Sequence, residues 1–416
     1  MEKLEKSVPV IRFKGFSEAW EQRKFEDCFN FPVSTNSLSR VMLNYDKGEV
    51  KNVHYGDVLI KYPCILNIKK EEIPYITGGC LEAYNSNLLE NGDLIFADAA
   101  EDETVGKAVE VNGITNENLV SGLHTIVARA TTQKAKYFLG YYINSDIYHR
   151  QLLRLMQGSK VSAISKGNLQ KTDVSFPKDI EEQQKIGSYF KKLDSTIALH
   201  QRKLDALKLM KKGFLQQMFP KIEADIPEIR FADFDGKWEQ RKLGEIFNER
   251  SERSADGELI SVTINSGVVK ASKLEKKDNS SFDKSNYKVV KKGDIAYNSM
   301  RMWQGASGYS SYDGILSPAY TVIYPRKDID TIFIAYMFKK IDMIQTFQRN
   351  SQGLTSDTWN LKFPSLSTIK IKIPANDEQI KITNLFQKLE YTSILHQNQI
   401  EMLKKVKKAY LQTMFI

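Results

Sequence analysis

A long internal duplication constrains the fold of this chain more than any other feature. The pentapeptide WEQRK occurs at Trp20–Lys24 and again, 218 positions later, at Trp238–Lys242. The two copies stay alike over longer segments, Pro9–Phe31 and Pro227–Glu249. Both segments carry an apolar triad with the i, i+3, i+4 spacing of one helical turn. The triads are Phe25, Cys28 and Phe29 in the first copy and Leu243, Ile246 and Phe247 in the second.

A second pair of matching segments lies downstream of each copy. EQQKIGSYFKKLDSTIALHQ begins at Glu182, and EQIKITNLFQKLEYTSILHQ begins 196 positions later at Glu378. The insert between the matched blocks is therefore 22 residues shorter in the second half. With 416 residues, the chain also exceeds the roughly 250–300 residues at which single cores stop growing. We predict two domains that share a frame and differ in their inserts.

Apolar residues in the downstream segments recur in steps of four and three, which is the spacing of a coiled-coil seam. Each pattern predicts a helix of about 39 residues, roughly 58 Å long at 1.5 Å per residue. We expect the two helices to pair antiparallel, which would place the inserts at opposite ends. The predicted seam consists of Ile186, Phe190, Leu193, Ile197, His200, Leu204, Leu207, Phe214 and Met218, and of Ile382, Phe386, Leu389, His396, Ile400, Leu403, Tyr410 and Met414.

Polar residues occupy two matching positions of this seam. His200 and His396 stand at one of them. A polar seam residue usually fixes the register of a coiled coil, so we favour that role over catalysis or metal binding. Lys211 and Lys407 stand at the other position. We expect their ammonium groups to extend into water, as long cationic side chains do on apolar faces.

The inserts combine strand-like runs with helical patterns. Gly-Asp turns lead into apolar runs at Gly92 and Gly293, further strand-like runs begin at Gly56, Val120 and Leu316, and helical patterns begin at Tyr137 and Ile332. The predicted fold class is α+β, with two mixed α/β domains in a pseudo-twofold tandem repeat and two long helices in an antiparallel coiled coil. The predicted boundaries are 1–178 for the first domain, 179–220 for the central helix, 221–375 for the second domain and 376–416 for the C-terminal helix.

The composition favours one class of binding partner and one cellular location. The formal net charge of +9 favours an anionic partner such as nucleic acid. No apolar run has the length of a membrane span, and the charged N-terminus lacks the apolar core of an export signal. Cys28, Cys64 and Cys80 follow no metal-ligand spacing, which favours reduced thiols. We expect a cytoplasmic protein without membrane contact.

The sequence lacks the motifs that nucleotide-dependent enzymes use. It contains no G-x-x-x-x-G-K-[ST] phosphate loop and no Gly-rich nucleotide fingerprint. The Asn- or Asp-Pro-Pro-aromatic tetrapeptide of amino-methyltransferases is also missing. The fragment DKGEVK at Asp46–Lys51 only loosely resembles a nuclease cluster. We predict no catalytic residues and no metal site in this chain.

A polar loop follows each helical pattern, and these loops are candidate nucleic-acid contacts. Their hydroxyl, amide and amino groups suit phosphate oxygens and base edges, although an ordinary solvated loop would have a similar composition. Trp303 and Trp359 suit either stacking on DNA or loop packing, and we favour packing. The candidates are Lys160, Ser162, Ser165, Lys166 and Asn168 in the first domain, and Arg301, Gln304, Gln352, Thr355, Ser356, Thr358 and Asn360 in the second.

The chain resembles the specificity subunits of type I restriction-modification systems in the order in which its motifs occur. The features that carry the resemblance are RF-x-x-F-x-x-x-W at Arg12–Trp20 and Arg230–Trp238, EQ-x-KI at Glu182 and Glu378, and the helix ends FLQQMF and YLQTMF. The resemblance covers the whole chain. It implies that the two domains are target-recognition domains, that each reads one half of a split DNA target, and that the helices set the spacer length.

The resemblance also implies partners and cofactors. Two modification subunits, which bind S-adenosylmethionine and methylate adenine N6, would assemble on this chain. Two restriction subunits, which use ATP and Mg²⁺, would join them. The chain itself would bind double-stranded DNA, hold no cofactor and perform no chemistry. Two other hypotheses remain open: a coiled-coil interaction adaptor that reads no DNA sequence, and a stand-alone enzyme.

Overall fold

The computed structural model describes residues 8–156, 162–274, 282–356 and 358–416. The chain divides into two compact units. The first contains the residues up to His200 together with Asn398–Ile416, and the second is Gln201–Gln397. Each unit therefore combines one mixed domain with one half of each long helix. The unit division cuts through the helices, whereas the predicted boundaries treated each helix as a separate region.

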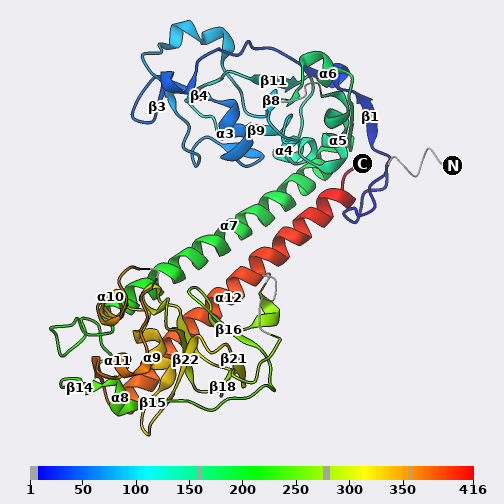
Figure 1. Cartoon of the computed structure of the whole chain (residues 1–416). Coiled ribbons are helices and arrows are strands. Elements are labelled where there is room, and N and C mark those ends of the chain that lie inside the picture. The colour runs from blue at the N-terminus through cyan, green and yellow to red at the C-terminus, as the bar shows by residue number, and fades with distance from the viewer. Residues whose placement is uncertain (1–7, 157–161, 275–281, 357) are drawn as a thin grey trace. The chain divides into compact units, whose positions relative to one another are not determined.

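Two helices of 38 residues each, α7 (Ile180–Gln217) and α12 (Asn376–Thr413), run side by side (Figure 1). In the first unit, Phe190 near the start of α7 stacks on Phe415 just beyond the end of α12, with 5.6 Å between ring centroids. In the second unit, Phe219 just beyond the end of α7 lies 6.1 Å from Phe386 near the start of α12. The helices therefore pair antiparallel, as the seam predicted. All 17 predicted seam residues are buried or half-buried.

The matching lysines of the seam form ion pairs across the helix pair. Lys211 lies 2.6 Å from Glu390, and Lys407 lies 2.6 Å from Asp194. The two lysine side chains remain 37% and 23% exposed, and each ammonium group also meets a carboxylate on the facing helix, which the sequence did not predict. Across the described ranges, no helix has the length and apolar character that a membrane crossing requires.

The first domain is built around a five-stranded sheet and a four-stranded sheet. The five-stranded sheet has the order β2-β11-β7-β9-β5, and the four-stranded sheet has the order β10-β4-β6-β3. The strands are β1 (Glu21–Lys24), β2 (Phe29–Asn30), β3 (Leu43–Asn44), β4 (Val50–Val53), β5 (Ile65–Asn67), β6 (Tyr75–Ile76), β7 (Leu94–Ala97), β8 (Ala99–Ala100), β9 (Ala108–Asn112), β10 (Asn118–Ser121), β11 (Thr125–Ala130), β12 (Ser162–Ala163) and β13 (Asp173–Phe176). The helices are α2 (Phe25–Cys28), α3 (Tyr55–Ile60), α4 (Phe138–Ile143), α5 (Asp146–Leu155) and α6 (Lys166–Gln170).

Among its described residues, the second domain has one four-stranded sheet, of order β15-β22-β19-β20, and three two-stranded ones. Its strands are β14 (Glu239–Lys242), β15 (Phe247–Glu249), β16 (Ile260–Thr263), β17 (Gly267–Lys270), β18 (Lys288–Val290), β19 (Ile295–Asn298), β20 (Ser307–Tyr309), β21 (Gly314–Leu316), β22 (Tyr320–Pro325) and β23 (Lys370–Ile373). Its helices are α8 (Leu243–Ile246), α9 (Thr331–Met337), α10 (Ile341–Asn350) and α11 (Phe363–Ser367).

The two domains share one antiparallel frame. β2-β11-β7-β9 in the first domain corresponds in order and pairing to β15-β22-β19-β20 in the second. The predicted Gly-Asp turns lead into β7 and β19. The Asp after each Gly is buried and bound by an arginine, Asp93 by Arg129 at 2.6 Å and Asp294 by Arg250 at 2.7 Å.

The WEQRK copies tie each domain to its long helices. The EQRK part forms β1 and β14, which pair antiparallel with β13 and β23 just before α7 and α12. Trp20 and Trp238 are only 4% and 3% exposed, so each tryptophan anchors the start of its domain in the core. Trp20 packs edge-on against Phe138 and Phe415, with ring centroids 6.1 and 6.4 Å away.

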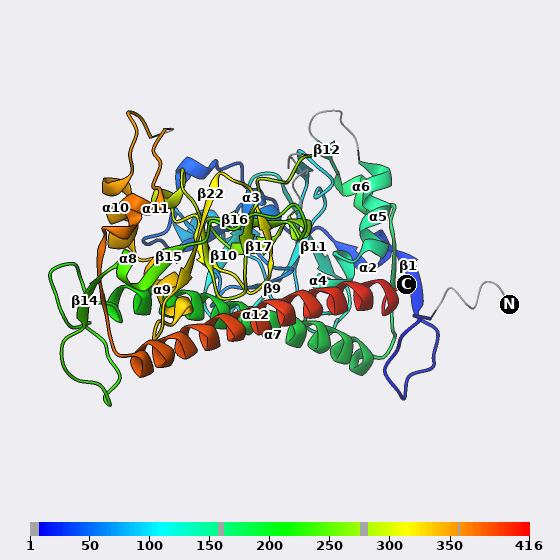
Figure 2. The same cartoon turned by 60° about the horizontal axis from the view of Figure 1, so that its bottom comes forward.

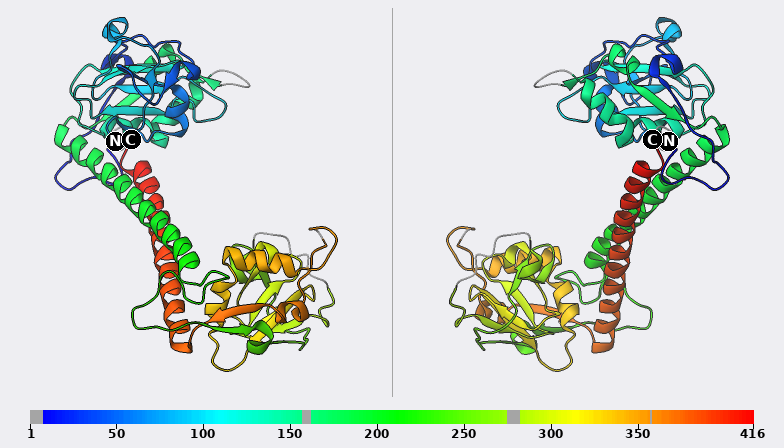
Figure 3. Two further views of the ribbon diagram at one scale, coloured as in Figure 1. Left: turned by 90° about the vertical axis from the view of Figure 1, so that its left-hand side faces the viewer. Right: turned by 90° about the vertical axis from the view of Figure 1, so that its right-hand side faces the viewer.

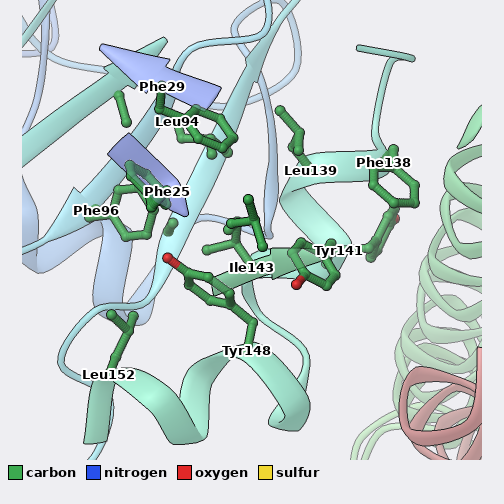
Figure 4. Packing of buried hydrophobic residues seen from close by; sticks show 14 of the residues in the cluster. Phe25, Phe29, Leu94, Phe96, Phe138, Leu139, Tyr141, Ile143, Tyr148 and Leu152 are labelled. Atoms are coloured by element: carbon green, nitrogen blue, oxygen red, sulfur yellow. The ribbon is translucent and has the colours of Figure 1, made fainter. Parts of the chain in front are cut away.

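Aromatic residues from distant segments build the core of the first unit. Figure 4 shows Phe25 and Phe29 beside Leu94 and Phe96 of β7, with Tyr148 and Leu152 of α5 below them. Phe25 and Phe29 stack with 4.3 Å between ring centroids, so the two residues lie on one face, as their spacing predicted. α2 and α8 cover the first two triad positions in each copy, and all six triad residues are buried.

Three segments differ from their sequence-based predictions. The helical pattern from Ile332 is broken into α9 and α10, with Lys340 as the N-cap of α10. The strand-like run from Gly56 begins inside α3, whose N-cap His54 accepts a hydrogen bond from the Gly56 N–H at 3.1 Å. Both Nη atoms of Arg40 donate to Asp57, in the first turn of α3, at 2.7 Å. The N-cap and this ion pair therefore stabilise a helix here instead of a strand. The helical pattern from Tyr137 is broken into α4 and α5 at Ser145, whose hydroxyl caps α5.

Candidate nucleic-acid interface

The loop that follows α10 carries most of the candidate contacts of the second domain. Gln352 and Asn360 close it as an antiparallel bridge, with N–H to carbonyl distances of 3.0 and 2.8 Å. Within the loop, Thr358 Oγ1 donates to the Thr355 carbonyl at 2.9 Å and accepts from the Thr355 N–H at 3.1 Å. The loop projects from the body of the domain (Figure 2; Figure 3). The side chains of Gln352, Thr355, Ser356 and Thr358 are exposed and therefore accessible to a nucleic acid.

The structure brings the remaining candidates of the second domain to the same place. Arg301 precedes a short 3-10 helix, Met302–Gln304, and its Nη1 donates to Gln304 Oε1 at 3.1 Å. Trp303 of this turn packs edge-on against Trp359 of the loop, with 5.2 Å between ring centroids. Both tryptophans are half-buried, which agrees with the favoured packing role. The pair joins two segments that are far apart in the sequence into one surface.

The half-buried Lys339 holds the turn that carries Arg301 and Gln304. Lys339 Nζ donates to the Gly305 carbonyl at 2.6 Å and to the Ile264 carbonyl at 3.2 Å. Burial lowers the pKa of Lys339 to about 8. The ammonium form therefore predominates at neutral pH, and it holds the end of the Arg301–Gly305 turn in place.

In the first domain, two candidates have a structural role that the sequence reasoning missed. Ser165 and Asn168 form a capping box at the start of α6, with Ser165 Oγ accepting from Asn168 N–H at 3.1 Å and Asn168 Oδ1 accepting from Ser165 N–H at 2.9 Å. Asn168 Nδ2 also donates to the Leu155 carbonyl at 3.1 Å. Lys166 is exposed, and Ser162 is half-buried in β12. Lys160 lies outside the described residues.

The segment after β7 is the first domain's counterpart of the turn that carries Arg301. Ile164 N–H donates to the Asp98 carbonyl at 2.8 Å, as Leu361 N–H donates to the Ser299 carbonyl at 2.8 Å. The first domain therefore presents Asp98 and the exposed Glu101–Glu103 where the second presents Arg301 and Gln304. Carboxylates accept hydrogen bonds from the cytosine amino group, whereas Arg donates to guanine and Gln pairs with adenine. The two sites thus differ in base-edge chemistry.

Two arginines at matching places in the two domains were not predicted as contacts from the sequence. Arg154 lies in the last turn of α5 and Arg349 in the last turn of α10, each beside its candidate loop, and both are exposed. Apart from these arginines, the sequences of the two helices are dissimilar, so only the shared fold relates Arg154 to Arg349. Phosphate groups are the same in every DNA sequence, so both domains can bind them with the same cation. The two arginines are therefore suited to phosphate contacts.

The comparisons with known proteins agree with this architecture. A model of the type I restriction modification DNA specificity domain matches residues 18–209 and, separately, residues 235–405. The fold and the duplicated site thus define a tandem DNA-recognition protein built on a pair of helices. The chain belongs to the type I restriction-modification DNA specificity family.

Individual relatives are distant in sequence. A protein of Methanocaldococcus jannaschii, named as a type I restriction enzyme MjaX specificity subunit, is 21% identical over 237 residues, which are 55% of this chain and 52% of the relative. The match thus spans about half the length of that relative. The crystal structure of the type I S subunit from M. genitalium is 14% identical, with a TM-score of 0.59 over 98% of this chain and 99% of that one. A chain from a study of complex assembly in the type I system is also 14% identical, with a TM-score of 0.50 over 96% and 98%.

Proposed function

We propose that each of the two domains reads one half of a bipartite DNA target. The observation that carries this proposal is one shared four-stranded frame bearing two loop surfaces of different chemistry. The first surface is rich in carboxylates, and the second carries Arg301, Gln304 and the amide and hydroxyl groups of the loop after α10. Different side chains on one frame select different bases. The two half-sites should therefore differ in sequence.

The paired helices set the separation of the half-sites in this proposal. A fixed protein frame determines half-site spacing, as dimer geometry does in other DNA-binding proteins. Helices of 38 residues are roughly 57 Å long. This length is compatible with half-site centres on the order of 10 to 17 base pairs apart, at roughly 3.4 Å per base pair. A change in helix length should then change the spacer.

Backbone contacts would come from groups that the two domains share. Arg154 and Arg349 are the candidates, because both are exposed beside a recognition loop. Such contacts raise affinity for any DNA and make binding depend on salt. Sequence preference would then depend on the dissimilar loops.

The chain would also be the scaffold of a larger complex. Large apolar side chains remain exposed on the long helices: Leu199 and Met402 in the first unit, and Leu209, Tyr391 and Ile394 in the second. Exposed apolar side chains of this size suit protein contacts. We propose that two modification subunits dock on the helices and that two restriction subunits join them. S-adenosylmethionine, ATP and Mg²⁺ would belong to those partners, while this chain performs no chemistry and acts in the cytoplasm.

A binding selection tests the proposal. The purified chain is incubated with a pool of randomised duplexes, and the bound fraction is sequenced after several rounds at fixed salt. The expected result is two short, dissimilar motifs at a constant separation. Uniform weak affinity for all duplexes would instead favour a coiled-coil adaptor. Methylation or cleavage by the chain alone, supplied with S-adenosylmethionine, ATP and Mg²⁺, would contradict the non-catalytic role.

A further inference from the structure

A cluster of three polar side chains joins the first domain to both long helices. Tyr141 of α4 donates its hydroxyl to Asp194 Oδ2 of α7 at 2.8 Å, and Lys407 of α12 donates to Oδ1 of the same carboxylate at 2.6 Å. Lys407 Nζ also lies 5.3 Å from the centre of the Tyr141 ring. A single carboxylate thus receives one bond from the domain and one from the second helix.

The second unit contains the same cluster with the helices exchanged. Tyr336 of α9 donates to Glu390 Oε2 of α12 at 2.9 Å, and Lys211 of α7 donates to Glu390 Oε1 at 2.6 Å. Lys211 Nζ lies 5.7 Å from the centre of the Tyr336 ring. The lysines and the carboxylates occupy matching positions of the repeated helices, and the tyrosines occupy matching positions of α4 and α9. Two domains with divergent inserts have therefore kept one tyrosine in common at the helix contact.

The cluster differs in kind from the ring contacts beside it. Next to it, the domains meet the helices through ring contacts, with 5.3 Å between the centroids of Tyr141 and Phe190 and 4.8 Å between those of Tyr336 and Phe386. Apolar contact is non-directional and tolerates small rotations. Hydrogen bonds to a charged acceptor are directional and about twice as strong as neutral ones. The Tyr–carboxylate–Lys bonds therefore restrict how each domain turns on its helix pair.

Both tyrosines are suited to a permanent donor role. Tyr141 is 1% exposed and Tyr336 is 9% exposed. Burial, together with the neighbouring negative charge, raises the pKa of each phenol. The hydroxyls thus remain protonated and donate to the carboxylate at every pH at which the protein works.

We propose that these two Tyr–carboxylate–Lys clusters are positioning elements that fix each recognition domain on the helices and thereby restrict the protein to one spacer length. The proposal rests on the proposed function, because it assumes that each domain reads a half-site. The clusters touch no DNA in this proposal. They act through the orientation of the recognition loops.

The test compares spacer selectivity in matched variants of the full chain. Tyr141→Phe and Tyr336→Phe, combined in one protein, remove both hydroxyls and keep both rings. Affinity is measured for the selected target and for duplexes whose spacer is one base pair shorter or longer. We expect the ratio of affinities between correct and altered spacers to fall by about ten-fold, with a smaller loss on the correct target. Lys211→Arg combined with Lys407→Arg, which keeps the charge and the donors, should preserve the ratio.

Tyr142→Phe is the matched control. Tyr142 lies beside Tyr141 on α4, but its hydroxyl accepts a hydrogen bond from Ser175 N–H within the domain at 2.7 Å. Its loss should lower stability without altering spacer selectivity. An unchanged ratio in the Tyr141→Phe, Tyr336→Phe protein, or an equal fall in the Tyr142→Phe control, would overturn the positioning role. If the wild-type chain itself shows no sequence preference, the proposed function fails instead, so the two failures are distinguishable.

Discussion

Replacement of Arg230 by methionine should lower the free energy of unfolding of the second unit by several kcal/mol. Arg230 Nε and Nη2 bind the two oxygens of Glu378 at 2.7 Å each, and Nη1 donates to the Gly236 carbonyl at 2.6 Å. The side chain of Glu378 is 1% exposed and that of Arg230 is 13% exposed. Arg230→Met would leave a buried carboxylate without its counter-ion. Breaking a buried pair in this way costs about 3–5 kcal/mol, whereas an exposed pair contributes roughly 0–1 kcal/mol.

Urea unfolding followed by tryptophan fluorescence measures this loss. Three of the four tryptophans, Trp238, Trp303 and Trp359, lie in the second unit, so the signal mainly follows that unit. With a slope of about 2–3 kcal/mol per M, the expected loss lowers the midpoint by roughly 1–2 M. Arg12→Met removes the equivalent partner of Glu182 in the first unit and should leave this transition nearly unchanged.

A second variant separates the buried charge from the lost packing. Arg230→Met combined with Glu378→Met removes both charges and should recover most of the lost stability, because an apolar pair of similar volume often replaces a buried ion pair at little cost. A loss below about 1 kcal/mol for the single variant would refute the reasoning. An equal loss in the double variant would show that packing, and not the unpaired carboxylate, causes the effect.

Three further predictions concern DNA contacts, pH and helix packing. Arg349→Gln should weaken binding to all duplexes alike and reduce the salt slope by about one, whereas Gln352→Ala should relax the preference at one base position; titrations at several salt concentrations distinguish them. Glu110 is buried and its pKa is raised to about 7, so its contribution to stability is complete below about pH 4.5 and is lost as pH rises through 7. Thermal unfolding should show this decline in the wild type, and Glu110→Gln should lack it. On α7, Gly187→Ala should destabilise, because a Cβ would lie 2.7 Å from the Lys136 carbonyl oxygen. A Cβ at Gly213 would meet no described atom beyond its own stretch of helix within 4 Å, so Gly213→Ala should stabilise by about 1 kcal/mol; equal effects in urea unfolding would contradict the close contact.

The features that the sequence predicted correctly are the ones with a long or repeated pattern. The seam from Ile186 to Met218 covers most of α7, so individual exceptions such as His200 did not obscure it. The two WEQRK segments were recognisable because each copy served as a comparison for the other. The Gly-Asp turns before β7 and β19 were recognisable for the same reason.

Short segments and long-range contacts set the limit of prediction. The apolar run after Gly56 is too short for its periodicity to separate a strand from a helix, and the ion pair of Asp57 with Arg40 that stabilises α3 is not local. The contact between Trp303 and Trp359 joins two segments that only the fold brings together. The capping box of Ser165 and Asn168, by contrast, follows a local rule that would have indicated α6.

Methylome sequencing of cells that carry this chain with its modification subunit tests the central claim most directly. Two dissimilar recognition surfaces on one frame predict a bipartite motif with unlike halves and a spacer of constant length. Exchange of the two inserts should exchange the halves and leave the spacer unchanged. A continuous palindromic motif, or methylation without sequence preference, would contradict the claim that the two domains read separate half-sites.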